Sequence, residues 1–459
     1  MLALAVFVSS NMVACNCIWA IGLDSPVRLD DAFAAIAAET VKGGYHQYPP
    51  FYNNVISPHA VVTRDAVYCA FQNTNGQPIM MAYDIGKRRW SEPVRASQFG
   101  LGRDAHGNPS ICIDSTGYIH IFYGCHGQAM RHTRSNKSYN ITSWQEQSVP
   151  TPRATYPQSM RMANNDIYLF YRAGGHMEPW CLRTSKDDGQ TWSEPEKIIE
   201  MRLEPNDPLA AAYCSFHPGS DSKTVHCFWV HKDDNARRVK GDRKHPWRPL
   251  KYPGLHEAVY RYNMYYIYRD TEGIWRNIAG DKVKLPVSKA FADKKCLVFD
   301  SGDEFTNIGF PTVDSNNCPY VRFPYGVGDW KKGDRIIVPW RHKFAHYDYD
   351  LSKWQVTDEV PQDWPLNVKT ILTAKGPAAP LLSCESKKGG DKSQGRWFIF
   401  FSTLRSSATA EDGQHARPSE EAGSFIFLYH ERGTPFCNTS QNGNPTGYAI
   451  REGGPVFVQ

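Results

Sequence analysis

Short runs of apolar residues, often alternating with polar ones, recur along most of the chain. Each run is bounded by Gly, Asn, Asp or Pro, and Tyr, Phe, Ile and Val dominate it, which favours β-strands. The runs are AVYCAF (66–71), GYIHIFYG (117–124), DIYLFYRA (166–173), TVHCFWVH (224–231), MYYIYRD (264–270), DRIIVPWR (334–341), RWFIFFST (396–403) and SFIFLYH (424–430). The only stretch that predicts a helix is the short DDAFAAIAAETV at 30–41. We therefore expect an all-β protein.

A looser repeat underlies these strands. A strand is followed by a polar turn and then by a Trp, at Trp90, Trp144, Trp192, Trp275 and Trp354. The first three are 54 and 48 residues apart, which is the size of a four-stranded propeller blade. The later gaps run near 80 residues, as though a blade were skipped or had diverged. The pattern predicts a single seven-bladed β-propeller over residues 23–459.

The sharpest copy of the repeat is TSKDDGQTWSEP, residues 184–195. It resembles the Asp-box of sialidase-like propellers, a turn between the two outer strands of a blade. Side chains of Ser185 and Asp187 can bond backbone N–H groups of their own turn, and Trp192 can pack between sheets. We expect this turn to be structural and the chemistry to lie elsewhere.

Composition narrows the class of protein further. The chain has 459 residues, 41% of them hydrophobic, so a large core can form. Its net charge of +5, from 52 basic and 47 acidic residues, is too mild to indicate nucleic-acid binding. The one basic stretch, at 235–248, is expected to be a solvated loop.

The N-terminal segment predicts export. Residues 1–22 open with an apolar run that is too short and too interrupted to span a membrane. A secretory signal peptide fits best, and a lipoprotein signal ending at Cys15 is the alternative, so we expect a secreted, periplasmic or surface-attached protein. The twelve cysteines include no CxxC pair, and buried thiols and long-range disulfides both fit the sequence.

Candidate catalytic residues lie at the ends of two predicted hairpins. In the segment 104–132, His106 precedes one strand and His126 follows the next, so both should face the same end of the sheet. His120 lies inside a strand and is expected to be packed. By the same logic Tyr156 begins a strand of the following blade, and Arg172 ends the next strand, 16 residues later.

Two imidazoles, a phenol and a guanidinium without a nearby carboxylate pair suit a particular chemistry. Glycoside hydrolysis normally needs two Asp or Glu residues at the bond. Abstraction of a proton beside a carboxylate instead needs an Arg to neutralise that carboxylate, together with a base and an acid. The set therefore points to β-elimination from a uronic acid.

The same residues carry a resemblance to a known family. The segment 104–128, Tyr156 and Arg172, and later VHKDD and YRYNMYYIYRD, look like the BNR-repeat (Asp-box) propellers that contain the ulvan lyases and the rhamnose–glucuronate lyases acting on gum arabic. The resemblance spans roughly residues 45–380. It implies a seven-bladed lyase acting on an anionic uronate-containing polysaccharide.

Roles follow from this resemblance. His106 and Tyr156 would be the base and acid, Arg172 would neutralise the carboxylate, and His126 would bind or orient the substrate. Whether His106 or Tyr156 takes the C5 proton depends on whether the sugar is glucuronic or iduronic acid, which the sequence leaves open.

The resemblance also implies further contacts and an optional ion. His231 and Arg261 match positions that line the same cleft. Some relatives carry a structural zinc or calcium ion, although the nearby candidates here lack a recognised ligand spacing; they are Cys214, His217, His226, Cys227 and His231. We expect no cofactor for catalysis and a monomeric protein.

Two other functions fit the same sequence. A non-catalytic propeller could use these aromatic and cationic groups to bind an acidic sugar. A sialidase-like exo-glycosidase would need an arginine cluster, a Tyr/Glu pair and several Asp-boxes, whereas this chain has one clear copy.

Overall fold

The computed structural model describes a large central part of the chain and several strands nearer its ends. The described residues are 60–73, 75–84, 86–87, 89–102, 104–203, 210–233, 261–302, 304–326, 329–331, 335–337, 341–365 and 368, with strands at 21–23, 27–28, 397–404, 424–430, 449–451 and 454–455. The helix expected at 30–41 and the basic loop at 235–248 lie outside them. So does the leader, except that Ile21 and Gly22 belong to β1.

Strands dominate the described residues and form six sheets of four or more strands. We number these sheets 1 to 6. Sheet 1 holds β3 (Ala60–Val62), β4 (Ala66–Gln72), β5 (Pro78–Asp84), β6 (Arg89–Trp90), β7 (Val94–Arg95), β30 (Ala449–Arg451) and β31 (Gly454–Pro455). Sheet 2 holds β8 (Ser110–Ile113), β9 (Ile119–Tyr123), β10 (Arg131–Ser135) and β11 (Trp144–Glu146). Sheet 3 holds β12 (Thr155–Arg161), β13 (Ile167–Arg172), β14 (Trp180–Ser185) and β15 (Glu196–Ile199).

The remaining sheets follow in chain order. Sheet 4 holds β16 (Ala210–Pro218), β17 (Val225–Asp233), β18 (Arg261–Arg269), β19 (Trp275–Arg276) and β20 (Leu297–Phe299). Sheet 5 holds β21 (Phe305–Thr306), β22 (Phe310–Val313), β23 (Pro319–Gly326), β26 (Arg341–Asp348) and β27 (Lys353–Thr357). Sheet 6 holds β1 (Ile21–Leu23), β2 (Val27–Arg28), β28 (Trp397–Leu404) and β29 (Ser424–His430), and β24 (Asp329–Lys331) pairs with β25 (Arg335–Ile337) alone.

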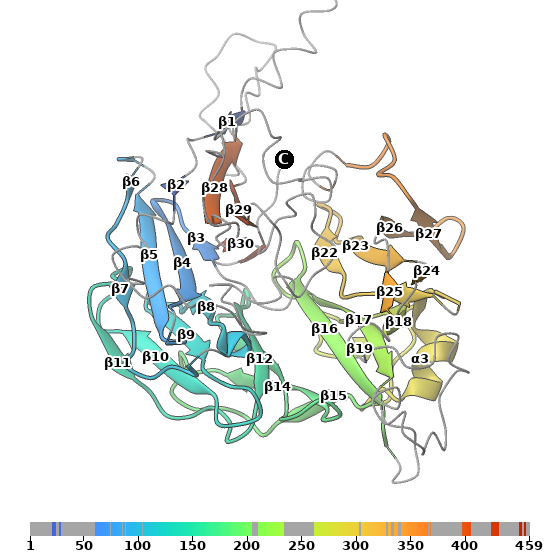
Figure 1. Cartoon of the computed structure of the whole chain (residues 1–459), viewed down its shortest axis with the longest axis horizontal. Coiled ribbons are helices and arrows are strands. Elements are labelled where there is room, and N and C mark those ends of the chain that lie inside the picture. The colour runs from blue at the N-terminus through green and yellow to red at the C-terminus, as the bar shows by residue number, and fades with distance from the viewer. Residues whose placement is uncertain are drawn as a thin grey trace, which may run out of the picture.

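The sheets are arranged one after another around a centre, as in a β-propeller (Figure 1). Strands at the start of neighbouring sheets lie against each other: β3 contacts β8, β8 contacts β12, and β16 contacts β22. Segments from both ends of the chain share sheets, because β30 pairs in parallel with β3 and β28 pairs with β1 and β2. The all-β prediction is confirmed, whereas a count of seven blades goes beyond the six sheets that the described residues form.

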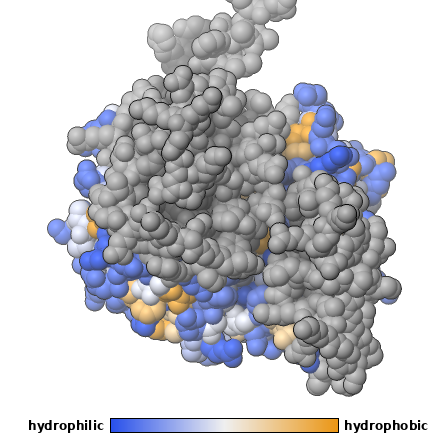
Figure 2. All heavy atoms as spheres, in the orientation of Figure 1, coloured by the Kyte–Doolittle hydropathy of each residue, from blue (hydrophilic) through white to orange (hydrophobic). Residues whose placement is uncertain are grey.

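Inner strands are buried on both faces. All five residues of β9 and all six of β13 are buried, which is expected where each sheet packs between two neighbours. His120 in β9 is fully buried, as predicted for a packed residue. The described surface in view is mostly hydrophilic, with small apolar patches between polar side chains (Figure 2).

The Asp-box is a structural turn at the end of the sheets away from His106. Asp187 accepts hydrogen bonds from the Ser185 hydroxyl at 2.8 Å and from the Thr191 backbone N–H at 2.9 Å. Trp192 packs edge-on against Phe122 of sheet 2, with ring centroids 5.5 Å apart. The predicted packing of this Trp between sheets is therefore confirmed.

Two expectations about the pattern were wrong. Trp192 lies between the outer strands β14 and β15 of sheet 3, and Trp275 and Trp354 lie in the outer strands β19 and β27 of sheets 4 and 5, so no blade is skipped between them. The first gap is long because residues 234–260 separate β17 from β18, and the second is long because α3, β20, β24 and β25 are inserted. The helix α3 (Lys289–Lys295), capped by Ser288, was also not predicted.

Eight cysteines lie in the described part of the chain, and all are free thiols. Seven of them are buried. Burial raises the pKa of their thiols, as at Cys125 and Cys296. At these eight positions the structure has free thiols, so of the two alternatives that the sequence left open the long-range disulfides are not formed there. No helix among the described residues is long and apolar enough to cross a membrane.

Candidate active site

A carboxylate joins the two histidines at the end of the first hairpin. His106 lies in the short 3-10 turn η1 (Ala105–Gly107), which precedes β8, and His126 follows β9. Their rings stack with centroids 3.7 Å apart and an interplanar angle of 9°. Asp104 contacts His106 Nδ1 through Oδ1 at 2.5 Å and His126 Nδ1 through Oδ2 at 2.6 Å. One carboxylate therefore holds both imidazoles by the same ring atom.

The hydrogen bonds fix the protonation of the imidazoles. Burial would raise the pKa of Asp104, but the bonds from His106 and His126 lower it far below its usual value, so Asp104 is an acceptor. Both Nδ1 atoms must then donate, so a neutral His106 ring carries its lone pair on Nε2. Burial lowers the pKa of His106, and the bond to Asp104 opposes this only in part. His106 is therefore a neutral imidazole with Nε2 as its acceptor at neutral pH.

Tyr156 lies beside His106 in a distorted part of β12. Its ring centroid is 5.6 Å from that of His106. The backbone at Tyr156 has φ of 60°, and the register with β13 shifts between Thr155 and Gln158. A left-handed tyrosine at a β-bulge is uncommon and often marks a functional site. The bulge turns this ring out of the regular alternation of the strand.

Arg172 is the last residue of β13 and pairs with Thr155 across the hairpin. Its side chain is fully buried. The guanidinium carbon lies 4.9 Å from the centroid of the Tyr156 ring and 5.3 Å from that of Tyr213. The structure thus brings His106, His126, Tyr156 and Arg172 together, from two neighbouring sheets, although their catalytic roles remain predictions.

Tyr213, which the sequence pattern does not single out, completes the cluster. Tyr213 lies in β16, and Arg261 from β18 lies 4.7 Å from its ring centroid. Burial would raise the pKa of Tyr213, but the cations Arg172, Lys232 and Arg261 lower it to about 6. Because Tyr213 sits in the apolar run AAAYC, nothing in the sequence distinguished it from a core tyrosine.

The other two predicted residues, His231 and Arg261, come from the strands β17 and β18 of the same sheet as Tyr213. Arg261 contacts the Tyr213 ring as described, and therefore belongs to the cluster. His231 is buried in β17, opposite Ala212, and stacks on Tyr262 with ring centroids 6.2 Å apart. The neighbouring Lys232, also missed, contacts His176 Nδ1 at 2.8 Å.

The cysteine and histidine candidates for a structural ion do not meet in one place. His217 contacts the Pro218 carbonyl oxygen, and His226 contacts Tyr266 and Asn317. Within the described ranges, only Asp104, His106 and His126 place three potential ligand atoms within 4.8 Å of one another. The hydrogen bonds of Asp104 to both rings already account for that arrangement, so the zinc or calcium ion stays a prediction.

This geometry suits proton transfer next to an anion. It offers a neutral imidazole, a phenol and a buried cation within contact of one another. Both oxygens of Asp104 are engaged by histidines, which leaves that carboxylate unsuited to act as the acid or nucleophile of glycoside hydrolysis.

Comparison with known families places the chain. A model described as a BNR repeat-containing family member matches residues 66–357, well over half of the sequence. The chain belongs to this BNR-repeat family. The matched range includes His106, His126, Tyr156, Arg172 and Arg261.

Curated relatives of this BNR-repeat chain are ulvan lyases. It is 28% identical over 344 residues to "Ulvan Lyase-PL25" of Pseudoalteromonas sp. (strain PLSV), covering 67% of the chain and 66% of the relative. It is 29% identical over 326 residues to the ulvan lyase of Alteromonas sp. (strain LOR), covering 65% of the chain and 63% of the relative. The BNR-repeat chain thus spans just under two thirds of the length of these relatives.

Solved structures agree with the fold of this BNR-repeat chain. The structure of a PL25 ulvan lyase bound to -[GlcA(1-4)Rha3S]- superposes with a TM-score of 0.58 at 21% identity, covering 89% of the chain and 83% of that structure. The polysaccharide lyase Uly1 gives a TM-score of 0.52 at 13% identity, with coverages of 90% and 96%. At these identities the likeness concerns the fold alone.

Proposed function

We propose that the protein is a polysaccharide lyase that cleaves a uronate-containing polymer, ulvan or a similar rhamnose–glucuronate chain, by β-elimination. The observation that carries the proposal is the contact series His106–Tyr156–Arg172, with centroid and cation–ring distances of 5.6 and 4.9 Å. The ulvan lyases among its relatives support the choice of polymer. We further propose a seven-bladed propeller that acts as a monomer outside the cytoplasm.

Arg172 neutralises the substrate carboxylate in this mechanism. Its side chain is buried, so its charge is weakly screened and interacts strongly with an anion that enters the site. A guanidinium can bind both carboxylate oxygens. Charge that develops on the carboxylate when C5 loses its proton is then stabilised where it forms.

His106 and Tyr156 move the protons. For a uronate whose C5 hydrogen faces the imidazole, His106 Nε2 takes that proton. The C5–H electron pair becomes the C4–C5 double bond, and the C4–O bond breaks. The Tyr156 hydroxyl donates its proton to the leaving oxygen. For the C5 epimer, transfer of the Tyr156 proton to His106 Nε2 would come first; the Tyr156 phenolate would then take the C5 proton and the His106 imidazolium would protonate the leaving oxygen.

Asp104 and His126 position the base. Asp104 accepts the His106 Nδ1–H and so keeps the lone pair on Nε2, the atom that takes the proton. When His106 gains the C5 proton, the adjacent carboxylate stabilises the imidazolium. His126, stacked on His106, limits how the ring can turn and can bind the sugar through its own Nε2. Asp104 is thus a positioning residue.

Ulvan digestion followed by absorbance at about 235 nm tests this function. Elimination creates an unsaturated uronate that absorbs there, so the wild-type protein should give a steady rise. New reducing ends without absorbance would indicate hydrolysis, and depletion of the protein onto the polymer without cleavage would indicate a binding propeller. Either of those two results would contradict the proposal.

A further inference from the structure

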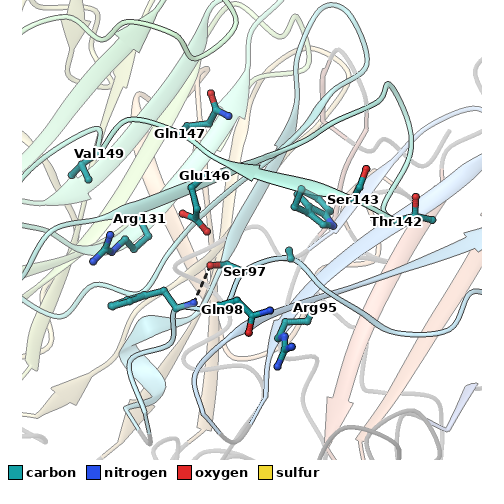
Figure 3. Close-up of a pocket in the computed structure, with 12 residues that line it drawn as sticks. Arg95, Ser97, Gln98, Arg131, Thr142, Ser143, Glu146, Gln147 and Val149 are labelled. Carbon is teal, nitrogen blue, oxygen red and sulfur yellow. Dashed lines mark hydrogen bonds between the residues drawn. The ribbon is translucent and has the colours of Figure 1, made fainter.

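A polar groove lies between sheets 1 and 2, and none of the residues of the catalytic cluster lines it. One wall is formed by the segment 95–99 that includes and follows β7, and the other by β10, β11 and the residues that flank β11 (Figure 3). The volume of this groove is about 500 Å³, within the range of sites that hold small ligands. Its lining residues are Arg95, Ala96, Ser97, Gln98, Phe99, Arg131, Thr142, Ser143, Trp144, Glu146, Gln147 and Val149.

The charged groups of the groove are held in place. The guanidinium of Arg131 lies 4.2 Å from the centroid of the Phe99 ring. On the same wall as Arg131, the Tyr123 hydroxyl donates to Glu146 Oε1 at 3.0 Å. Arg95, at the end of β7, is exposed and lies on the lower wall in Figure 3. Within the described ranges neither arginine forms an ion pair, so both can receive an external anion.

The combination of groups selects a class of ligand. Two arginines against one glutamate leave the groove with one net positive charge. Glu146, Gln98 and Gln147 can accept hydrogen bonds from hydroxyl groups, and the half-buried Trp144 adds an apolar surface of the kind that sugars pack on. A densely charged polyanion would be repelled by Glu146, whereas a hydroxyl-rich chain with widely spaced anions fits.

We propose that this groove is a second binding site for an anionic glycan. It holds one segment of the polymer while the catalytic cluster acts on another segment. The identity of the polymer rests on the proposed function. The groove itself does not take part in the elimination, and its contribution is to retain the enzyme on a long chain.

Affinity electrophoresis tests the site without turnover. The full-length His106→Asn variant is run in native gels that contain ulvan, and its dissociation constant is taken from the dependence of mobility on polymer concentration. Adding Arg95→Gln and Arg131→Gln should weaken binding about tenfold, because two solvent-accessible contacts between opposite charges, each of modest strength, are lost. Adding salt should weaken the parent more than this variant.

Two further variants keep the test independent of folding. Glu146→Gln retains the acceptor for Tyr123 but removes the negative charge, so it should tighten binding. Lys137→Ala removes an exposed cation of sheet 2 that does not line the groove and should leave binding unchanged. Unchanged binding in the double Arg variant, weaker binding in Glu146→Gln, or equal retardation by a neutral glucan would overturn the proposal. Because no outcome requires cleavage, a failure of the lyase activity is recorded separately by the absorbance assay.

Discussion

Replacing Asp104 by Asn changes the charge of the positioning group with almost no change in shape. The carboxylate now accepts from both imidazoles, at 2.5 and 2.6 Å. An amide has one acceptor oxygen and one donor nitrogen, so only one ring can keep its Nδ1–H bond. The other ring must lose its bond or move its proton to Nε2, which removes the proposed base if that ring is His106.

The size of the effect follows from the lost bond. A hydrogen bond to a charged group contributes about 1.5–3 kcal/mol, which corresponds to about a 10- to 160-fold fall in rate when it is made in the transition state. We expect kcat to fall by that factor and KM to change little, because Asp104 does not touch the sugar. The acid limb of the pH–rate profile should also move to lower pH in this variant, because the bond and charge of Asp104 raise the pKa of His106.

Initial rates at about 235 nm, measured over pH 4–9 for the wild type and Asp104→Asn, check this. Asp188→Asn is the matched control: it makes the same chemical change near the opposite end of the hairpin, where Asp188 accepts from the Ser115 hydroxyl at 2.9 Å. That control should keep its rate per folded molecule. An Asp104→Asn enzyme with full kcat and an unshifted acid limb would refute the positioning role.

The remaining predictions concern the proton-transfer groups, the cation and the Asp-box. His106→Asn and Tyr156→Phe should each lower kcat by about 10²- to 10⁴-fold without unfolding the protein, which circular dichroism beside the rate assay would establish. Arg172→Ala should cost about 2–5 kcal/mol of transition-state stabilisation, or about 30- to 5,000-fold in kcat/KM; full activity would exclude the neutralising role. Because the pKa of His106 is lowered, wild-type kcat/KM should hold as pH falls past about 6.5, the ordinary His value, and drop only at more acidic pH; a drop already above that value would show that another group limits the rate. Asp187→Ala removes hydrogen bonds to Ser185 and Thr191 and should lower Tm while leaving kcat per folded molecule unchanged, so a loss of kcat would place the Asp-box in the chemistry.

Hairpin geometry is the part of the site that could be predicted from sequence. Because the two ends of an antiparallel pair lie side by side, the spacings of His106 to His126 and of Tyr156 to Arg172 were enough to bring these residues together. The Asp-box was predictable for a similar reason, since its side chains bond within their own turn.

Contacts between segments far apart in sequence could not be predicted in the same way. Asp104 reaches His126 only because η1 folds back over the hairpin, 22 residues away. Tyr213 acquires its lowered pKa from Arg172, Lys232 and Arg261 on β13, β17 and β18, which lie 41, 19 and 48 residues away from it in the chain. The connection 234–260 between β17 and β18 and the insertions at α3 and β24–β25 hid the regular order of the sheets, because they lengthen the spacing of the Trp repeat along the chain while the sheets stay consecutive.

The reaction itself is tested most directly by digesting ulvan in H₂¹⁸O and measuring the masses of the products by mass spectrometry. If His106, Tyr156 and Arg172 carry out elimination, every cleavage leaves one unsaturated uronate end, and no ¹⁸O enters the products during bond breakage. Products that carry one ¹⁸O for each bond broken, with saturated ends, would mean that water attacks the glycosidic bond and would contradict the account.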